Sequence, residues 1–457
     1  MIKMAKKIIK KTIITEAISI TVQETEKVVS ELPNGRDTIK KTREYWHVLG
    51  PGLTTGASDD DPSGIATYSQ TGAQYGFQLM WLSLVTFPLM AAVQEMCARI
   101  GMVTGRGLAS SIRIHFSKKV LYVCTLSLFA ANAFNIGADL GAMAKGAQLL
   151  RPSLNFPMLV IGFTLISVGL QVFTPYERYA KYLKWLAMVL LAYIASALLA
   201  HLNWGSVLKH AALPSITFSK DQILLICAIL GTTISPYLFF WQTSQEVEQE
   251  IMDGKTSIAS RVDDVHKLDV HKMRIDVWSG MLLSNLVMFF IIAACGALLF
   301  THGITNITSA AQAAEALRPF AGSSTYPLFA AGIIGTGLLA IPVLAGASSY
   351  AFAESFKLNE GLYRKFKQAH AFYGVIILSM LVGLGLNFVG LDPIKALIYS
   401  AVFNGIVAPI VLVLIVLISS NKKIMGPWVN KPSTTYIGWM VTGLMCLAGV
   451  AAIWSLF

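Results

Sequence analysis

The sequence predicts an all-α polytopic membrane protein, and two observations carry that prediction. Of the 457 residues, 54% are apolar and 13% are charged, which is far more apolar than a soluble domain of this length can bury. Apolar stretches on the order of 20 residues, long enough to cross a bilayer as helices, recur at about eleven places. They lie at about 46–74, 76–100, 119–150, 155–174, 181–203, 222–253, 275–300, 325–356, 369–389, 394–420 and 434–457.

The basic residues predict how these spans are oriented. The net charge is +11, and roughly thirty of the 36 lysines and arginines fall in the N-terminal tail 1–45 and in alternate loops. Because cytoplasmic loops are enriched in lysine and arginine, we expect a cytoplasmic N-terminus and, with an odd number of spans, a C-terminus outside. The expected location is the inner membrane of the cell. The lipid bilayer, and not nucleic acid, is the expected partner of residues 46–457.

The five cysteines do not indicate a disulfide framework or a metal cluster. All of them fall inside apolar stretches, and no two are spaced as a CxxC pair. They are typical of small buried apolar residues. We therefore expect no cofactor, and the sequence indicates no protein partner.

Three consecutive aspartates, Asp59, Asp60 and Asp61, stand in the middle of the first apolar span. Insertion of each into a membrane costs about 2.5–3.5 kcal/mol, so the three together would cost about 8–10 kcal/mol unless they are protonated, hydrated or paired with a cation. Pro62 and Gly64 follow directly, which predicts that the helix is broken here and that backbone carbonyls are freed. Carboxylate and carbonyl oxygens are the ligands of hard cations. An aqueous loop between two short spans is the alternative, but each flank is too short to cross the bilayer alone.

A second proline interrupts the sixth span within the stretch 230–237, which is Leu-Gly-Thr-Thr-Ile-Ser-Pro-Tyr. Broken spans at corresponding positions of two halves are typical of inverted-repeat transporters that bind their substrate near the midplane. We therefore predict a first repeat at about 46–203, a second at about 222–420 and an additional span at about 434–457.

Several motifs agree with this arrangement. Gly50-Pro51 precedes Asp61-Pro62 by the spacing of a GP…DP motif, and the remaining matches are Gly72-Ala73-Gln74-Tyr75-Gly76, Gln94, Ala98-Arg99-Ile100-Gly101 and Gly337-Leu338-Leu339-Ala340. At these residues the sequence resembles the natural-resistance-associated macrophage protein (NRAMP) family of divalent-metal transporters. The resemblance implies a leucine-transporter-type fold, a 5+5 inverted repeat with an eleventh span. It also implies transport of a divalent cation by alternating access, with spans 1 and 6 as the gate.

The resemblance assigns the metal-binding aspartate of the family to Asp61. The glycine–asparagine pair of the family is replaced by Ser63-Gly64, and its methionine and histidine in the sixth span are replaced by Ser235 and Tyr237. Oxygen ligands favour Mg²⁺, Ca²⁺ or Mn²⁺, whereas a thioether favours softer metals. The pattern resembles the NRAMP-related magnesium transporters, so we expect Mg²⁺ first and Mn²⁺ next. Transport of a transition metal with different pore-lining residues remains the alternative.

We expect the remaining site residues to act around Asp61. Asp60, Thr232, Thr233 and Ser235 are the further candidate metal ligands. The residues that we assign to the cation pathway or its gating are Asp59, Pro62, Ser63, Gly64, Gly231, Pro236, Tyr237, Gln242 and Asn404. Glu95 is expected to pair with Arg99 one helical turn later.

Proton coupling is left open by the sequence. Asp139 in the third span resembles the first of two family acids that carry protons, whereas the second position is Ala142. Uniport driven by the membrane potential is therefore as compatible with the sequence as a relay from Asp61 to Asp139. Three other hypotheses remain: a proton-coupled Mn²⁺ or Fe²⁺ symporter, an amino-acid or amine symporter of the same fold, and a membrane-embedded aspartyl hydrolase. No enzyme signature supports the hydrolase.

Overall fold

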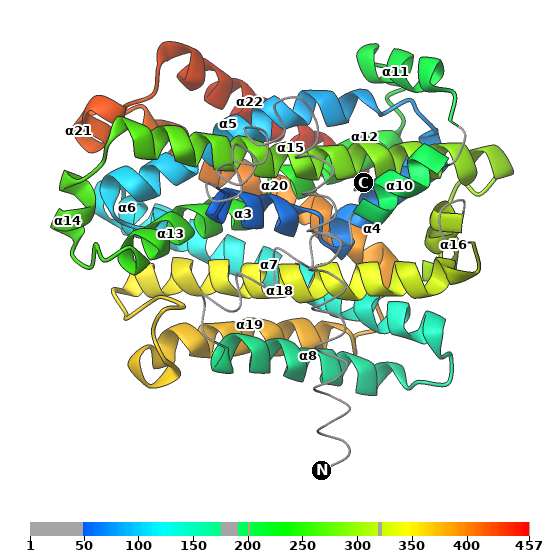
Figure 1. The fold of residues 1–457 in the computed structure, drawn as a ribbon, viewed down its shortest axis with the longest axis horizontal. Helices are drawn as coiled ribbons and strands as arrows, with labels where there is room; N and C mark the ends of the chain where they lie inside the picture. Colours follow the sequence, from blue (N-terminus) through cyan, green and yellow to red (C-terminus); the bar gives the residue numbers. More distant parts are fainter. Residues whose placement is uncertain (1–48, 175–190, 200–201, 319–321, 457) are drawn as a thin grey trace, which may run out of the picture. The chain divides into compact units, whose positions relative to one another are not determined.

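Long apolar helices make up the protein in the computed structural model (Figure 1), which describes residues 49–174, 191–199, 202–318 and 322–456. All regular structure in these residues is helical. Every helix described below belongs to the part of the chain from Pro51 onward. The N-terminal tail 1–45 and residues 181–190 of the predicted fifth span lie outside the described residues.

The helices of the first predicted repeat are α3 (Pro51–Asp59), α4 (Pro62–Tyr75), α5 (Trp81–Thr104), α6 (Leu108–His115), α7 (Lys118–Leu150), α8 (Phe156–Phe173), α10 (Leu191–Leu199) and α11 (Trp204–Ala212). Those of the second are α12 (Lys220–Thr233), α13 (Pro236–Met252), α14 (Ile258–Asp263), α15 (Lys267–Leu298), α16 (Ala310–Ala314), α18 (Thr325–Phe356), α19 (His370–Leu386) and α20 (Pro393–Ser419). The last helices are α21 (Lys422–Met425) and α22 (Pro432–Leu456). Short 3₁₀ turns connect several of them, at Phe300–His302, Glu315–Leu317, Gly322–Ser324, Phe366–Gln368 and Gly426–Trp428.

The spans agree with the predicted positions. Eight of the described helical segments are long and apolar enough to cross a membrane, counting α12 and α13 together, and α19 is a shorter apolar helix. The half-helices α3 and α4 together occupy the first predicted span, and α10 occupies part of the fifth. The prediction of an all-helical membrane protein is therefore confirmed.

The structure departs from the predicted boundaries in two connections, after the fifth and after the sixth span. The seventh span was predicted from 275, but α15 begins at Lys267 because its polar first turns continue the helix beyond the apolar stretch. The long loops predicted after the fifth and sixth spans contain α11 and α14. Hydropathy locates the part of a helix that contacts lipid, and it misses the polar turns that extend into water.

Both broken spans restart in the same way. Pro62 is the first residue of α4 and Pro236 is the first residue of α13. Proline suits this position because the first helical N–H has no partner within the helix and the ring already has a helical φ angle. The breaks that the sequence predicted from two prolines are thus the starts of two half-helices.

Helix α3 packs backbone to backbone against α15 (Figure 1). A Cβ atom on Gly56 would lie 2.2 Å from the Gly280 carbonyl oxygen, and one on Gly280 would lie 2.1 Å from the Gly52 carbonyl oxygen. Small residues four apart allow this approach in membrane helices. The Asp276 carboxylate on α15 also accepts the N–H groups of Gly52 and Leu53, at 2.6 and 3.0 Å, and so caps the start of α3. These contacts hold the first half-helix to the seventh span.

Helix α7 contacts α4 of the first broken span. It packs against α18, α19 and α20, and α20 packs in turn against α4 and α12. The half-helices α4 and α12 therefore meet in a space enclosed by α7, α15 and α20.

We expect Gly280→Ala to destabilise the protein by about 1–3 kcal/mol, because the added methyl group would overlap the Gly52 carbonyl and force the two helices apart. The measurement is the midpoint of thermal unfolding in detergent. Gly374→Ala is the matched control, since a Cβ there meets nothing within 4 Å and alanine favours a helix by about 0.5–1 kcal/mol. Equal midpoints for the two variants would contradict the close packing of α3 on α15.

Candidate metal site

The three aspartates occupy the break between α3 and α4 and are all buried. Asp59 is the last residue of α3, and Asp61 is the N-cap of α4. Their exposed fractions are 0% for Asp59, 0% for Asp60 and 1% for Asp61. The backbone is irregular here, so the directions of the three side chains follow neither the two-residue period of a strand nor the 3.6-residue period of a helix. Asp59 and Asp60 share one neighbour, whereas Asp61 contacts different residues.

Asp61 joins α4 to α7. Its Oδ1 atom accepts the N–H of Gly64 at 2.6 Å, and its Oδ2 atom accepts the Asn135 amide at 2.8 Å. A carboxylate oxygen that accepts one hydrogen bond still has a lone pair for a cation. Asp61 is therefore held in place by the protein and can still bind an ion.

Asp59 and Asp60 face α15. The Ser284 hydroxyl donates to Asp59 Oδ2 at 2.6 Å and is 3.4 Å from Asp60 Oδ1. The remaining oxygens, Asp59 Oδ1 and Asp60 Oδ2, are buried and have no hydrogen-bond partner among the described residues. Leaving a charged oxygen buried without a partner is strongly unfavourable, which indicates a cation, proton or water as the missing partner.

Three oxygens converge at close range beside Gly64. A Cβ atom placed on Gly64 would lie 3.2 Å from the Asp59 carbonyl oxygen, 3.2 Å from the Thr232 hydroxyl and 3.4 Å from Asp61 Oδ1. A carbonyl, a hydroxyl and a carboxylate therefore converge where the glycine has no side chain. This donor set is that of a hard cation.

The second break contributes hydroxyl groups from the end of α12. The Thr233 hydroxyl donates to the Ile229 carbonyl at 2.8 Å, and the Ser235 hydroxyl donates to the Gly231 carbonyl at 2.6 Å. Both hydroxyls bond to their own half-helix through their protons and keep oxygen lone pairs. Of the candidate ligands in this span, Thr232 is the residue that the structure brings next to Asp61.

The second half of the second broken span, α13, begins with Pro236 and Tyr237. The Tyr237 hydroxyl donates to the Ser58 carbonyl at 3.0 Å, which connects α13 to the last turn of α3. Gly231 packs against α20, because a Cβ there would lie 2.0 Å from the Ala401 carbonyl oxygen. These residues position the two half-helices relative to each other.

Two residues that the sequence analysis missed, Asn135 and Ser400, complete a polar network. The Ser400 hydroxyl lies 2.7 Å from the Asn135 amide oxygen and 3.0 Å from the Ser63 hydroxyl, and Ser63 donates to the Leu397 carbonyl at 2.9 Å. Asn135 precedes Asp139 by four residues, so both lie on one face of α7. That spacing was the available signal for Asn135. Ser400 has no comparable signal in the sequence.

The remaining polar candidates are buried. Both carboxylate oxygens of Asp139 lack a hydrogen-bond partner among the described residues, as does the Asn404 amide oxygen. Gln242 donates to Glu246 at 2.8 Å, and its own amide oxygen is likewise unpartnered there. Among the described residues, no three His, Cys, Asp or Glu side chains converge as a metal site. The site therefore combines one or two carboxylates with carbonyl and hydroxyl oxygens.

Glu95 belongs to a separate network. The predicted pair with Arg99 is confirmed at 3.6 Å, and Arg274 makes a shorter contact with the same oxygen at 2.8 Å. The Trp278 indole N–H donates to the other oxygen at 2.9 Å. Glu95 therefore joins α5 to α15 and is not part of the cation site.

A family described as natural resistance-associated macrophage protein-like matches residues 52–455. The chain belongs to this family. A divalent metal cation transporter, MntH, of Aeromonas hydrophila is 24% identical over 413 residues, which cover 87% of this chain and 93% of that protein. The resemblance seen at the first-span motif is thus confirmed for the NRAMP family.

Solved structures show the same fold. A manganese transporter of Eremococcus coleocola matches with a TM-score of 0.70 and 17% identity, and covers 93% of this chain and 89% of that one. MHP1, a nucleobase-cation-symport-1 family transporter, matches with a TM-score of 0.56 and 16% identity over 89% of this chain and 91% of that one. The NRAMP-family chain therefore has the predicted leucine-transporter-type fold.

We expect Gly64→Ala to weaken Mg²⁺ and Mn²⁺ binding by about tenfold, because the added methyl group would crowd the three oxygens and push them out of position. Isothermal titration of the purified protein measures the change. Gly162→Ala is the control, because a Cβ there meets nothing within 4 Å. If Gly64→Ala bound both ions as tightly as Gly162→Ala does, these three oxygens would not form the binding position.

Proposed function

We propose that this protein carries a divalent metal cation across the inner membrane of the cell by alternating access. Its membership of the NRAMP family supports this proposal, as do relatives named as divalent metal cation transporters. The observation that carries it is the buried meeting point of two broken spans at unpartnered carboxylate oxygens. The basic loops support a cytoplasmic N-terminus and a C-terminus outside.

The proposed cargo is Mg²⁺, with Mn²⁺ next. The three oxygens around Gly64 are hard ligands, and the positions of the family's methionine and asparagine hold Ser235 and Gly64. Mg²⁺ dehydrates reluctantly and keeps several waters, so it needs space as well as oxygen ligands. A glycine at residue 64 lets three oxygens come together without a side chain between them, whereas a thioether at residue 235 would favour softer metals.

We assign Asp61 as the principal ligand, with the Thr232 hydroxyl and the Asp59 carbonyl beside it. Asp60 would act on the hydrated ion, and the carboxylate of Asp59 would attract cations to the pathway. Thr233 and Ser235 would contact the ion through their oxygen lone pairs. An amino-acid substrate fits poorly, because its carboxylate would face the three buried aspartates.

Aromatic side chains pack tightly along α13 next to the break. Tyr237, Trp241 and Glu248 follow one face of α13 at helical spacing. Trp241 is 1% exposed and packs edge-to-face on Tyr350, with ring centroids 6.3 Å apart. A Cβ atom on Gly346 would lie 2.6 Å from the Trp241 ring, so α18 fits tightly around it. We assign this ring pair as the barrier that must open toward the cytoplasm.

A proton-coupled symporter of Mn²⁺ or Fe²⁺ is the second candidate. Asp139 favours this candidate, because its buried carboxylate has no hydrogen-bond partner among the described residues. It lies on the same face of α7 as Asn135, whose amide donates a hydrogen bond to Asp61. Uniport needs no such relay. A membrane potential of 100 mV contributes about 2.3 kcal/mol per charge, so it could concentrate a divalent ion roughly a thousandfold.

Proteoliposome uptake of Mg²⁺, Mn²⁺ and Cd²⁺ tests the proposal. The wild type should take up Mg²⁺ and Mn²⁺, and Asp61→Asn should reduce uptake by at least about tenfold because it removes one ligand charge. Asp221→Asn, an exposed aspartate at the start of α12, is the matched control and should transport normally. Uptake of Cd²⁺ without any Mg²⁺ would contradict the proposed choice of ion.

Ser235→Met should shift the preference toward Cd²⁺, because a thioether would enter the site in place of a hydroxyl. The measurement is the ratio of initial Cd²⁺ and Mg²⁺ uptake rates in proteoliposomes. Ser127→Met on α7, which is half-buried, controls for the added side chain. An unchanged ratio in Ser235→Met would remove residue 235 from the ion site.

A pH-sensitive dye inside the same vesicles separates uniport from symport. For uniport, Mg²⁺ uptake leaves the internal pH constant and Asp139→Asn keeps most of the activity. Acidification that accompanies uptake and disappears in Asp139→Asn would establish the proton relay instead.

A further inference from the structure

A second polar cavity of about 470 Å³ lies at the end of the helices that the basic loops predict to be cytoplasmic. Its walls come from the connection after α5, from α6, α13, α14 and α18, and from the connection between α18 and α19. No residue of α3 or α4 lines it. The cavity is therefore separate from the proposed cation site, and its volume suits a small-molecule ligand.

Four arginines from different segments line this cavity: Arg106, Arg113, Arg261 and Arg364. No lysine lines it, although the neighbouring loops contain several, among them Lys255 and Lys367. General enrichment of basic residues in cytoplasmic loops would supply both types. A set of arginines alone is typical of sites that bind phosphate or carboxylate through the planar guanidinium group.

None of the four guanidinium groups forms an ion pair within the part of the chain that the structure describes. Arg113 donates to the Glu354 backbone carbonyl, and Arg364 donates to the Glu360 carbonyl at 3.0 Å. Carbonyl partners satisfy hydrogen-bond donors without neutralising the charge. Each arginine also keeps further N–H donors, since a guanidinium has five.

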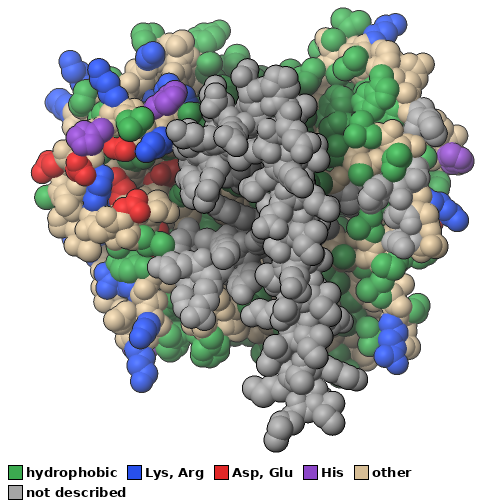
Figure 2. Space-filling model, viewed as in Figure 1, with side chains coloured by type: hydrophobic (Ala, Val, Ile, Leu, Met, Phe, Trp, Pro, Cys, Tyr) green, Lys and Arg blue, Asp and Glu red, His purple; other side chains and the backbone are tan. Residues whose placement is uncertain are grey.

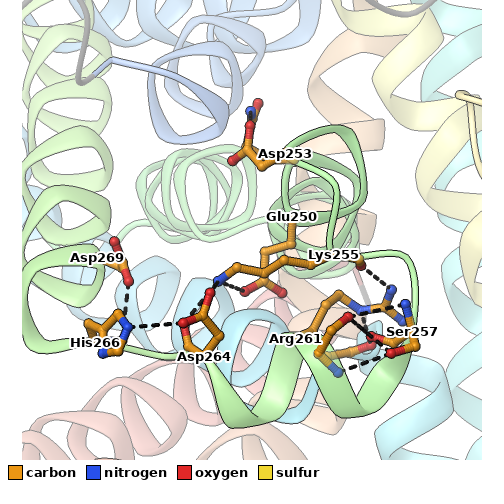
Figure 3. A network of polar contacts seen from close by, with 11 residues as sticks. Glu250, Asp253, Lys255, Ser257, Arg261, Asp264, His266 and Asp269 are labelled. Atoms are coloured by element: carbon orange, nitrogen blue, oxygen red, sulfur yellow. Dashed lines mark hydrogen bonds and ion pairs between the residues drawn. The ribbon is translucent and has the colours of Figure 1, made fainter.

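Arg261 shows the same pattern at the base of α14 (Figure 3). Its guanidinium donates to the carbonyls of Gly105 and Lys255, at 3.1 and 3.0 Å. The nearby carboxylate of Asp264 pairs instead with Lys255 at 3.2 Å, and this ammonium lowers the pKa of Asp264. Arg261 is buried, with 6% of its surface exposed, so its charge faces the cavity rather than open water.

The three acidic residues that line the cavity do not cancel the charge of its four arginines. Glu248 accepts the Leu362 N–H at 2.7 Å, and Glu354 accepts the Ser110 N–H at 2.8 Å, so both are bonded to the protein. Burial raises the pKa of Glu360 to about 9, so this side chain is neutral at pH 7. Four guanidinium groups therefore face two carboxyl groups that are hydrogen-bonded to the protein and one neutral acid, which favours an anion over a divalent cation.

Charged side chains also gather on the surface at this end of the molecule. Figure 2 shows Lys, Arg, Asp and Glu side chains at the left end of the view, where Figure 1 places α14. An anion that enters from this side would meet a surface of mixed charge and then a cavity with a net positive wall.

We propose that this cavity binds a phosphate group, carried by a soluble phosphate ester or by the headgroup of an anionic lipid. The bound group would contact Arg106 and Arg364, which line the cavity from two different connections, with Arg113 and Arg261 as further contacts. Because α13 and α18 form two of the walls, an occupant would hold together the helices that carry Trp241 and Tyr350. The site extends beyond the transport function and does not depend on the identity of the cargo.

Binding of inorganic pyrophosphate to the full-length protein in neutral detergent with EDTA tests the soluble source. Isothermal titration should show binding that Arg106→Gln weakens by about tenfold, the value of one charge-assisted hydrogen bond. Arg364→Gln is a second variant in case Arg106→Gln folds poorly. Lys367→Gln, an exposed lysine in the same connection as Arg364, removes the same charge outside the cavity and should change the affinity less than about twofold.

Native mass spectrometry after purification from phosphatidylglycerol nanodiscs tests the lipid source. Retention of phosphatidylglycerol by the wild type and its loss in Arg106→Gln and Arg364→Gln, without pyrophosphate binding, would assign the cavity to a lipid headgroup. The proposal is overturned if neither probe binds, or if both arginine variants bind as the wild type does. Both measurements report binding alone, so neither result bears on cation transport.

Discussion

The double hydrogen bond of Asp61 is the interaction on which the proposed cation site depends. One oxygen caps α4 through Gly64 and the other accepts the amide of Asn135 on α7. The cap allows a helix to begin in the middle of an apolar span, where free backbone N–H groups would otherwise lack partners. The hydrogen bond to Asn135 on α7 fixes the Asp61 carboxylate next to the second break, which lies between α12 and α13. The close approach of oxygens at Gly64 follows from these two constraints, because they place Asp61 beside the end of α12.

Burial of three adjacent carboxylates is tolerated because they are directed to different neighbours. Asp61 faces α7, whereas Asp59 and Asp60 share the Ser284 hydroxyl of α15. Two of their oxygens lack a partner in the protein, and a transported cation could provide one. The close packing of α3 on α15 through Gly52, Gly56 and Gly280 keeps the acids at this depth. Moving α3 would therefore expose the site and change its charge environment together.

The two polar regions of the protein carry opposite charge. The break in the middle of the spans offers carboxylate, carbonyl and hydroxyl oxygens to a cation, whereas the cavity near α14 presents four arginines. Helix α13 connects them, with Tyr237 at one end and Glu248 at the other. The aromatic pair of Trp241 and Tyr350 lies on the same helix face between these ends. A conformational change in α13 would therefore move residues in both regions.

The amino-acid sequence alone determined the membrane-spanning helices and the two breaks, because hydropathy, proline position and an acidic cluster are local properties of the chain, and the family resemblance pointed to Asp61 among the three acids. It did not determine where each aspartate points, since an irregular backbone has no side-chain period from which direction can be read. The partners Asn135, Ser284 and Ser400 lie on helices distant in sequence, and only packing brings them to the break. The oxygens around Gly64 come from two half-helices separated by about 170 residues. The three aspartates from which the sequence predicted a cation site are therefore only one part of the candidate site. The tertiary structure supplied the other part by bringing Thr232 next to Asp59 and Asp61.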